Sequence, residues 1–152
     1  MAQRDNPYGA FNFLVRLGTV PPGDGSIVGG FSDVSGLGNE IKYSEYRNGN
    51  DAENHVRKVA NTNTTDDVTL KRGVIGDLRL FSWLKRQREG RHEPQTVVIT
   101  LLDEAKKAVC SWTLDRAQPK KWVGPTLAAK GGGEVAMEEL HLVAENIEFK
   151  TL

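Results

Sequence analysis

Hydrophobic and polar residues alternate with a period of two over much of the chain, a pattern typical of half-buried β-strands. Cys110, Trp112 and Leu114, for example, share one face, and the residues between them point the other way. The same alternation occurs in four segments of the chain: Phe11–Leu17, Ile41–Tyr43, Val68–Val74 and Ala108–Leu114. The pattern therefore predicts a mainly β fold.

Two segments depart from simple alternation. Thr96–Leu102 carries apolar residues on both faces, which predicts a strand covered on both sides, by its own chain or by a partner. The short polar segment Asp103–Lys107 follows it and predicts a hairpin. In Glu134–Phe149 the alternation changes phase partway, as it does where a β-bulge bends a strand.

The segment Asp77–Glu89 is predicted to be an α-helix. Its first residue can cap the N-terminus, and Leu80, Phe81 and Leu84 recur at helical spacing, with Leu84 expected to face inward. Gly90 follows the segment where a left-handed residue would end a helix. The last turn carries basic residues, which the negative end of the helix dipole favours: Lys85, Arg86 and Arg88.

Three segments rich in glycine, proline, asparagine or charge are predicted loops: 21–25, 47–65 and 125–133. The second is unusually long for a compact domain, and Val56 and Val59 are its large apolar residues. Two interpretations stay open for it. It is either an exposed surface loop or an arm that becomes ordered against another subunit.

Composition limits the class of protein. The 152 residues are 38% hydrophobic and 26% charged, which suits one globular domain over residues 1–152 and argues against disorder. No apolar run is long enough to cross a membrane, so we expect no membrane anchoring. Cys110 is the single cysteine and cannot form an intrachain disulfide, which favours a chain made in the cytoplasm.

Charge is unevenly distributed although the net charge is zero. Lys71–Arg91 holds seven basic residues against Asp77 and Glu89, and Glu134–Phe149 holds five glutamates. These segments could neutralise each other within the fold, or they could pair with another copy or a second protein. A third interpretation is a monomeric binding module that uses the basic face for an anionic ligand.

The sequence gives little support to catalytic or cofactor chemistry. His55, His92 and His141 are too widely spaced for a typical zinc motif, so we expect no metal. Ser82 and Lys85 have the spacing of a serine–lysine acylase motif, but its partner motifs are missing. We therefore expect no cofactor and no enzymatic activity.

The order of several segments resembles one protein family. The opening strand Phe11–Val15 is followed by Gly30-Phe-Ser-Asp-Val-Ser-Gly-Leu37, Glu45-Tyr-Arg47, Val56-Arg-Lys58 and Val68-Thr-Leu-Lys-Arg-Gly-Val74, and then by a tryptophan-bearing helix. This series is similar to the tail tube proteins of contractile phage tails and of extracellular contractile injection systems, and distantly to the Hcp proteins of type VI secretion.

The resemblance implies a small antiparallel β-barrel or sandwich with one flanking helix, at about 77–89, and a long hairpin arm at about 46–65. It also implies a structural subunit whose hexameric rings stack into a hollow tube inside a contractile sheath. Sheath contraction would drive the tube through a target envelope to deliver a cargo effector or DNA. The expected partners are other copies, the sheath protein, and baseplate or initiator and cap proteins, in an injection particle or virion tail.

Two sets of contact residues follow from the same resemblance. The arm residues expected to contact other subunits or the adjacent ring are Tyr46, Arg47, Asn48, Val56, Arg57, Lys58 and Val59. The residues expected to face the sheath or another subunit are Lys85, Arg86 and Arg88. A tube-initiating subunit at the baseplate is an alternative role that the sequence leaves open.

Overall fold

The computed structural model describes residues 4–18, 27–50, 52–131 and 134–152, so the predicted loop at 21–25 and the last residues of the one at 125–133 lie outside the described part. The described residues form one helix, α1 (Arg79–Arg88). They also form β1 (Phe13–Leu17), β2 (Ile27–Gly29), β3 (Asp33–Ser35), β4 (Asn39–Tyr46), β5 (Arg57–Thr65), β6 (Val68–Gly73), β7 (Gln95–Leu102), β8 (Ala108–Val123), β9 (Met137–Val143) and β10 (Asn146–Thr151).

The long strand β8 belongs to two sheets. Its first part pairs with β7 and β10, and its second part, from Gln118, pairs with β9. The first sheet therefore has the order β2-β1-β7-β8-β10, and the second has the order β8-β9-β6-β3. Every pairing is antiparallel, and β8 changes partners next to Arg116, whose φ is 49°. The predicted mainly β sandwich is confirmed, but the described strands do not close into a barrel.

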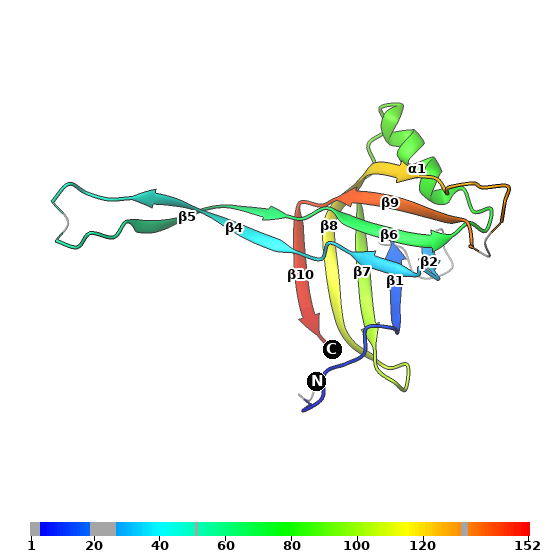
Figure 1. Cartoon of the computed structure of the whole chain (residues 1–152), viewed down its shortest axis with the longest axis horizontal. Coiled ribbons are helices and arrows are strands. Elements are labelled where there is room, and N and C mark those ends of the chain that lie inside the picture. The colour runs from blue at the N-terminus through cyan, green and yellow to red at the C-terminus, as the bar shows by residue number, and fades with distance from the viewer. Residues whose placement is uncertain (1–3, 19–26, 51, 132–133) are drawn as a thin grey trace.

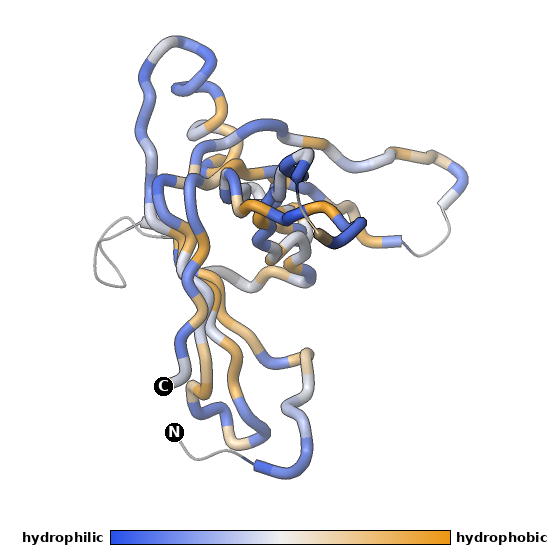
Figure 2. Tube along the Cα trace, turned by 90° about the vertical axis from the view of Figure 1, so that its left-hand side faces the viewer, coloured by the Kyte–Doolittle hydropathy of each residue, from blue (hydrophilic) through white to orange (hydrophobic). Residues whose placement is uncertain are grey.

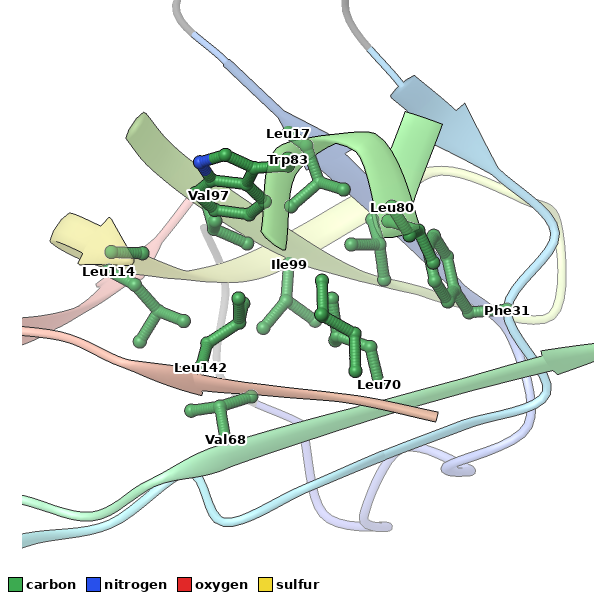
Figure 3. Close-up of a cluster of buried hydrophobic side chains, with 13 residues drawn as sticks. Leu17, Phe31, Val68, Leu70, Leu80, Trp83, Val97, Ile99, Leu114 and Leu142 are labelled. Carbon is green, nitrogen blue, oxygen red and sulfur yellow. The ribbon is translucent and has the colours of Figure 1, made fainter. Parts of the chain in front are cut away.

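The hydrophobic core lies between the two sheets and beneath the helix (Figure 3). The first sheet contributes Val15, Leu17, Val97, Ile99 and Leu114, and the second contributes Val68, Leu70, Leu140 and Leu142. The helix covers this layer with Leu80 and Trp83, and the Trp83 indole donates a hydrogen bond to the Glu93 carbonyl at 3.0 Å. Each fully buried side chain of this kind stabilises the fold by about 1.5–3 kcal/mol.

The helix ends where the sequence predicts but begins two residues later. Its N-cap is Leu78, and the Asp77 carboxylate accepts a hydrogen bond from the Arg79 amide at 3.0 Å. At the other end Gly90 has φ 92°, and the amide of Arg91 donates to the Arg86 carbonyl at 2.8 Å. This is the Schellman arrangement, in which a glycine readily adopts the left-handed conformation.

The inward face of the helix differs from the prediction. Leu80 and Trp83 are buried, whereas Leu84 is only half-buried, so the expectation that Leu84 faces the core is wrong. Leu80 and Trp83 are three residues apart and lie on one helix face, and it is the large Trp83 indole that fills the space above the sheets.

Two strand predictions also need correction, and a third is met only in part within a single chain. Phe11 lies outside β1 and is exposed. On β7, Val97 and Ile99 are buried as expected, but Val98 and Leu102 are half-buried, so the second face is only partly covered in a single chain. The phase change between Leu142 and Ile147 arises because the segment forms two strands, β9 and β10, that pair with different parts of β8. The earlier one lies within β9, where the buried Glu138 and not Met137 shares the inward face with Leu140.

The segments 30–37 and 68–74 lie side by side. β3 pairs with β6 so that Asp33 lies opposite Lys71 and Ser35 opposite Thr69. Gly36 then turns with φ 87°, and a Cβ at this position would lie 2.0 Å from the Asp67 carbonyl oxygen. Only glycine allows the backbone to pass this closely in a left-handed conformation.

Candidate interaction surfaces

The most prominent surface is a two-stranded hairpin that projects from the body (Figure 1). We call residues 39–65, with β4, β5 and the connection between them, the arm. Every residue of β4 is exposed, as are all residues of β5 before the last two. An isolated two-stranded hairpin is marginally stable in water, so an arm of this length gains stability when something covers it.

The arm begins earlier than predicted. The sequence places it at about 46–65 and treats Ile41–Tyr43 as a half-buried strand, but Ile41 and Tyr43 are 51% and 58% exposed. That prediction is wrong because β4 is already beyond the sandwich and pairs only with β5 in the described chain. The two side chains add an apolar surface that the sequence reading did not assign to the arm.

The predicted contact residues all lie on this arm. Tyr46 is the register partner of Arg57, and Lys58 lies opposite Glu45, with which it forms an ion pair. Lys58 also donates a hydrogen bond to the Glu45 carboxylate, and this bond lowers the pKa of Glu45. Val59 pairs with Ser44. Arg47 and Asn48 follow β4, and Val56 immediately precedes β5.

The connection at the far end of the arm is held by local hydrogen bonds. The Tyr46 hydroxyl bonds the Asn48 side chain, and the Arg47 guanidinium donates to the Glu53 carbonyl at 3.3 Å. His55 lies 3.0 Å from the Glu53 carboxylate. All of these groups are near the chain surface, so the contacts shape the turn without burying it.

The basic end of α1 forms a second exposed surface. Lys85 and Arg88 are exposed, and the half-buried Arg86 donates from Nε to the Glu93 carboxylate at 3.1 Å. This end of the helix therefore presents positive charge where the dipole is negative. The structure brings the three predicted residues together in the last turn, far along the chain from the arm residues.

Charge pairing within the chain accounts for part of the uneven charge distribution. In the register of β6 and β9, Lys71 lies opposite Glu139 and Arg72 opposite Glu138, and both pairs form ion pairs. The interaction with Lys71 lowers the pKa of Glu139. The basic and acidic segments thus neutralise each other in part, as the first of the sequence interpretations expects.

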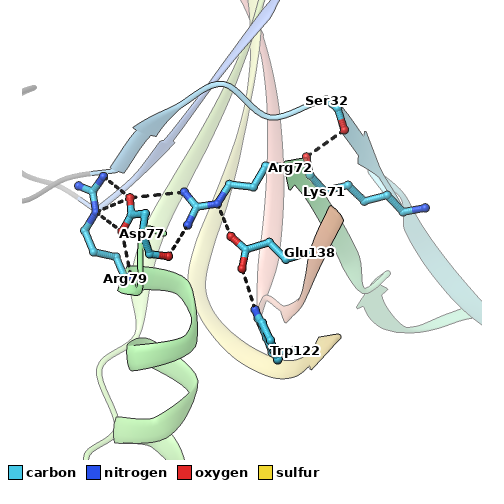
Figure 4. A network of polar contacts seen from close by, with 7 residues as sticks. All are labelled: Ser32, Lys71, Arg72, Asp77, Arg79, Trp122 and Glu138. Atoms are coloured by element: carbon cyan, nitrogen blue, oxygen red, sulfur yellow. Dashed lines mark hydrogen bonds and ion pairs between the residues drawn. The ribbon is translucent and has the colours of Figure 1, made fainter. Parts of the chain in front are cut away.

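A buried polar network joins the second sheet to the start of the helix (Figure 4). Arg72 donates to Glu138 and to the Asp77 carbonyl, and the Trp122 indole donates to the other oxygen of Glu138 at 3.2 Å. Arg79 binds the Asp77 carboxylate, and its side-chain hydrogen bond is the main cause that lowers the Asp77 pKa to about 2. Sequence reasoning missed this network, although the alternation of β6 places Arg72 on the same inward face as Val68 and Leu70.

The structure adds no candidate catalytic centre in the residues it describes. His55 lies on the arm, His92 follows the helix, and His141 lies on β9 between Thr69 and Glu139. In the described ranges no three potential metal-ligating side chains cluster. No helix in the described part of the chain has the length and apolar character needed to cross a membrane.

Comparisons with known proteins agree with this architecture. Residues 9–148 match the family described as T4-like virus tail tube protein gp19. No curated protein sequence gives a significant match. A chain from the sheath–tube complex of the PVC extracellular contractile injection system in its extended state is 25% identical, with a TM-score of 0.82 over 96% of this chain and 93% of that one.

Two further structures show how far the similarity extends. A chain from the baseplate of the anti-feeding prophage is 26% identical, with a TM-score of 0.80, and 97% of each chain is covered. Hcp1 from Flavobacterium johnsoniae shares the fold at 11% identity, with a TM-score of 0.54 over 91% of this chain and 98% of that one.

Proposed function

Because the chain belongs to the T4-like virus tail tube protein family, it is a structural tail tube subunit of a phage tail or contractile injection system, and we propose that its copies form six-membered rings that stack into a hollow tube. The arm supports this proposal most directly. It exposes apolar side chains on two strands that, within the described chain, are hydrogen-bonded only to each other, so a neighbouring subunit is the natural cover.

The arm would reach the adjacent ring. Its predicted contact residues, Tyr46, Arg47, Asn48, Val56, Arg57, Lys58 and Val59, are in or next to the two strands that project furthest from the body. Rings close by rotation, whereas stacking is open-ended and needs other proteins to end it. Each contact can be weak, since many copies act together in the stack.

The proposed partners are a contractile sheath, a baseplate or initiator protein and a cap. Similar chains come from a PVC sheath–tube complex, an anti-feeding prophage baseplate and an anti-feeding prophage tube-terminating cap. The basic helix end, with Lys85, Arg86 and Arg88, would face the sheath or another subunit. The chain would be made in the cytoplasm and assembled there into the particle. Sheath contraction would then expel the tube and deliver an effector or DNA from its lumen.

Electron microscopy of the full chain, purified with its sheath and baseplate partners, tests the proposal. We expect hollow tubes with six-fold symmetry and a constant repeat along the axis. Particles that contain only monomers of this chain would contradict it. Counting copies per particle by quantitative mass spectrometry then separates a main tube subunit, present in many rings, from a tube-initiating subunit, present in one.

A further inference from the structure

The inner face of the first sheet extends beyond the second sheet and is left partly uncovered. In Figure 1 the strands β7, β8 and β10 continue downward past β6 and β9, which cross above them. In register, Phe13 lies opposite Leu101, and Ile99 lies opposite Trp112. The centroids of the Trp112 and Phe149 rings lie 5.2 Å apart, and Phe149 remains exposed. Apolar residues appear along these strands in the lower part of Figure 2.

A hollow of about 230 Å³ lies where this uncovered face meets the second sheet. Its apolar lining comes from both sheets: Phe13, Val34, Leu37, Ile99, Leu101 and Trp112. Within the described chain, β3 is the edge strand of the second sheet, so the hollow has a strand with an available edge as one wall. Such an edge can accept another strand by main-chain hydrogen bonding.

The arm has the features needed to fill such a hollow. Ile41 and Tyr43 are two residues apart on β4 and share one exposed apolar face. Only Asp66 and Asp67 separate β5 from β6, so the arm continues the second sheet outward. In a single chain the arm points away from the body, which keeps it from covering the chain's own hollow (Figure 1).

The side-chain alternation of the two strands is also compatible. On β3, Val34 packs against the core and the flanking Asp33 is exposed. On β4, Lys42 lies between Ile41 and Tyr43 and points the opposite way. Asp33 is exposed and borders the hollow, so a β4 strand lying beside β3 would bring Lys42 close to an opposite charge.

We propose that this hollow receives the arm of a second copy, with β4 beside β3 and the Ile41 and Tyr43 side chains over Leu101 and Trp112. The inference rests on the proposed tube function and names the surface on which the arm is seated. It explains why the chain carries two exposed apolar surfaces that cannot meet within one copy. Their mutual burial would link each subunit to the next.

Site-specific photo-crosslinking tests the contact. A chain with Tyr43→benzoylphenylalanine, labelled with ¹⁵N, is mixed with unlabelled wild type, assembled into tubes and irradiated. We expect crosslinks between labelled and unlabelled chains to map to peptides of β1, β3, β7 or β8. Leu127→benzoylphenylalanine is the control, because Leu127 is exposed on a loop outside the hollow. The yield on those peptides should be at least tenfold higher from position 43.

A second variant measures assembly directly. Leu101→Asp places a charge on the wall of the hollow and should reduce the tube yield at least tenfold, while Leu127→Asp leaves it unchanged. If wild-type chains form no tubes, the proposed function fails and this inference fails with it. If tubes form but position 43 crosslinks elsewhere, or folded Leu101→Asp assembles normally, the inference alone is overturned. If Leu101→Asp does not fold, the crosslink decides.

Discussion

Arg72 on β6 and Glu138 on β9 lie directly opposite each other, and their side chains form an ion pair with 2.5 Å between Nε and Oε1. The two residues are only 3% and 6% exposed. Trp122 and the carbonyl of Asp77 complete the hydrogen bonds of the pair. A buried charge that loses its partner keeps its desolvation cost, so this pair is a sensitive point of the fold.

We predict that Glu138→Leu lowers the free energy of unfolding by about 3–5 kcal/mol, because the buried Arg72 guanidinium loses its directly bonded carboxylate and keeps only the Asp77 carboxylate, 3.6 Å from its Nη1. Urea denaturation of the unassembled chain measures the change. The double variant Arg72→Leu/Glu138→Leu is the control, and it should recover most of the loss since no buried charge remains. A double variant no more stable than the single one would contradict the explanation.

Gly36→Ala should destabilise the chain by about 1–3 kcal/mol, because its Cβ would collide with the Asp67 carbonyl and its φ is unfavourable for alanine. Thermal unfolding followed by circular dichroism gives the difference. Gly30→Ala is the matched control, since no atom lies within 4 Å of the Cβ position there. Equal effects at both positions would show that the close approach at Gly36 does not matter.

The Asp77 carboxylate should make stability depend on pH in the acid range. The hydrogen bond from Arg79 lowers its pKa in the fold to about 2, from an ordinary value of 3.8. Its stabilisation, at most about 2 kcal/mol, is therefore complete above about pH 4 and disappears as the pH falls towards 2. The stability difference between wild type and Asp77→Asn should shrink over that range.

Urea denaturation at several pH values between 2 and 5 measures this dependence. Glu134→Gln changes an exposed carboxylate outside the network, and its difference from wild type should stay nearly constant. A constant difference for Asp77→Asn as well would mean that its carboxylate contributes nothing through ionisation.

Shortening the arm should separate folding from assembly. Replacing residues 44–59 with Asn-Gly joins Tyr43 to Ala60, which are register partners, through a turn suited to hairpins. Among the described residues of this range all but the half-buried Asn48 are exposed, and none belongs to the core, so we expect a melting temperature within about 2 °C of wild type. Electron microscopy should show no stacked tubes. An unfolded variant would mean that the arm stabilises its own body.

Charge reversal at the helix end tests the surface proposed to face the sheath. Lys85→Glu/Arg88→Glu changes two exposed residues and leaves the Arg86–Glu93 ion pair in place. We expect co-sedimentation with sheath protein to fall at least tenfold if opposite charges hold the two proteins together. Arg116→Glu/Lys120→Glu makes the same charge change on exposed residues of β8 as a control. Undiminished sheath binding by the helix variant would remove this surface from the proposal.

Local sequence signals predicted most of the regular structure. Alternation located β6 and the first half of β8, and a run of apolar residues on both faces located β7. Gly90 and the basic residues of the last turn located the end of α1. These features depend on neighbouring residues, since caps and side-chain direction are set within a few positions of the chain. They failed at Leu84 and at the β9–β10 segment, where the neighbours that decide burial and pairing come from elsewhere in the chain.

The sequence by itself determined that strands dominate, that one helix ends at Gly90, and that the order of motifs is that of a tail tube protein. Only the tertiary structure decided which faces are covered. Ile41 and Tyr43 alternate as a core strand does, yet they are exposed because β4 extends past the sandwich. Alternation places Arg72 on the same face as Val68 and Leu70, but only the fold supplies the opposing Glu138 that allows a cation to be buried there. Periodicity fixes the direction of a side chain, and burial depends on what packs against it.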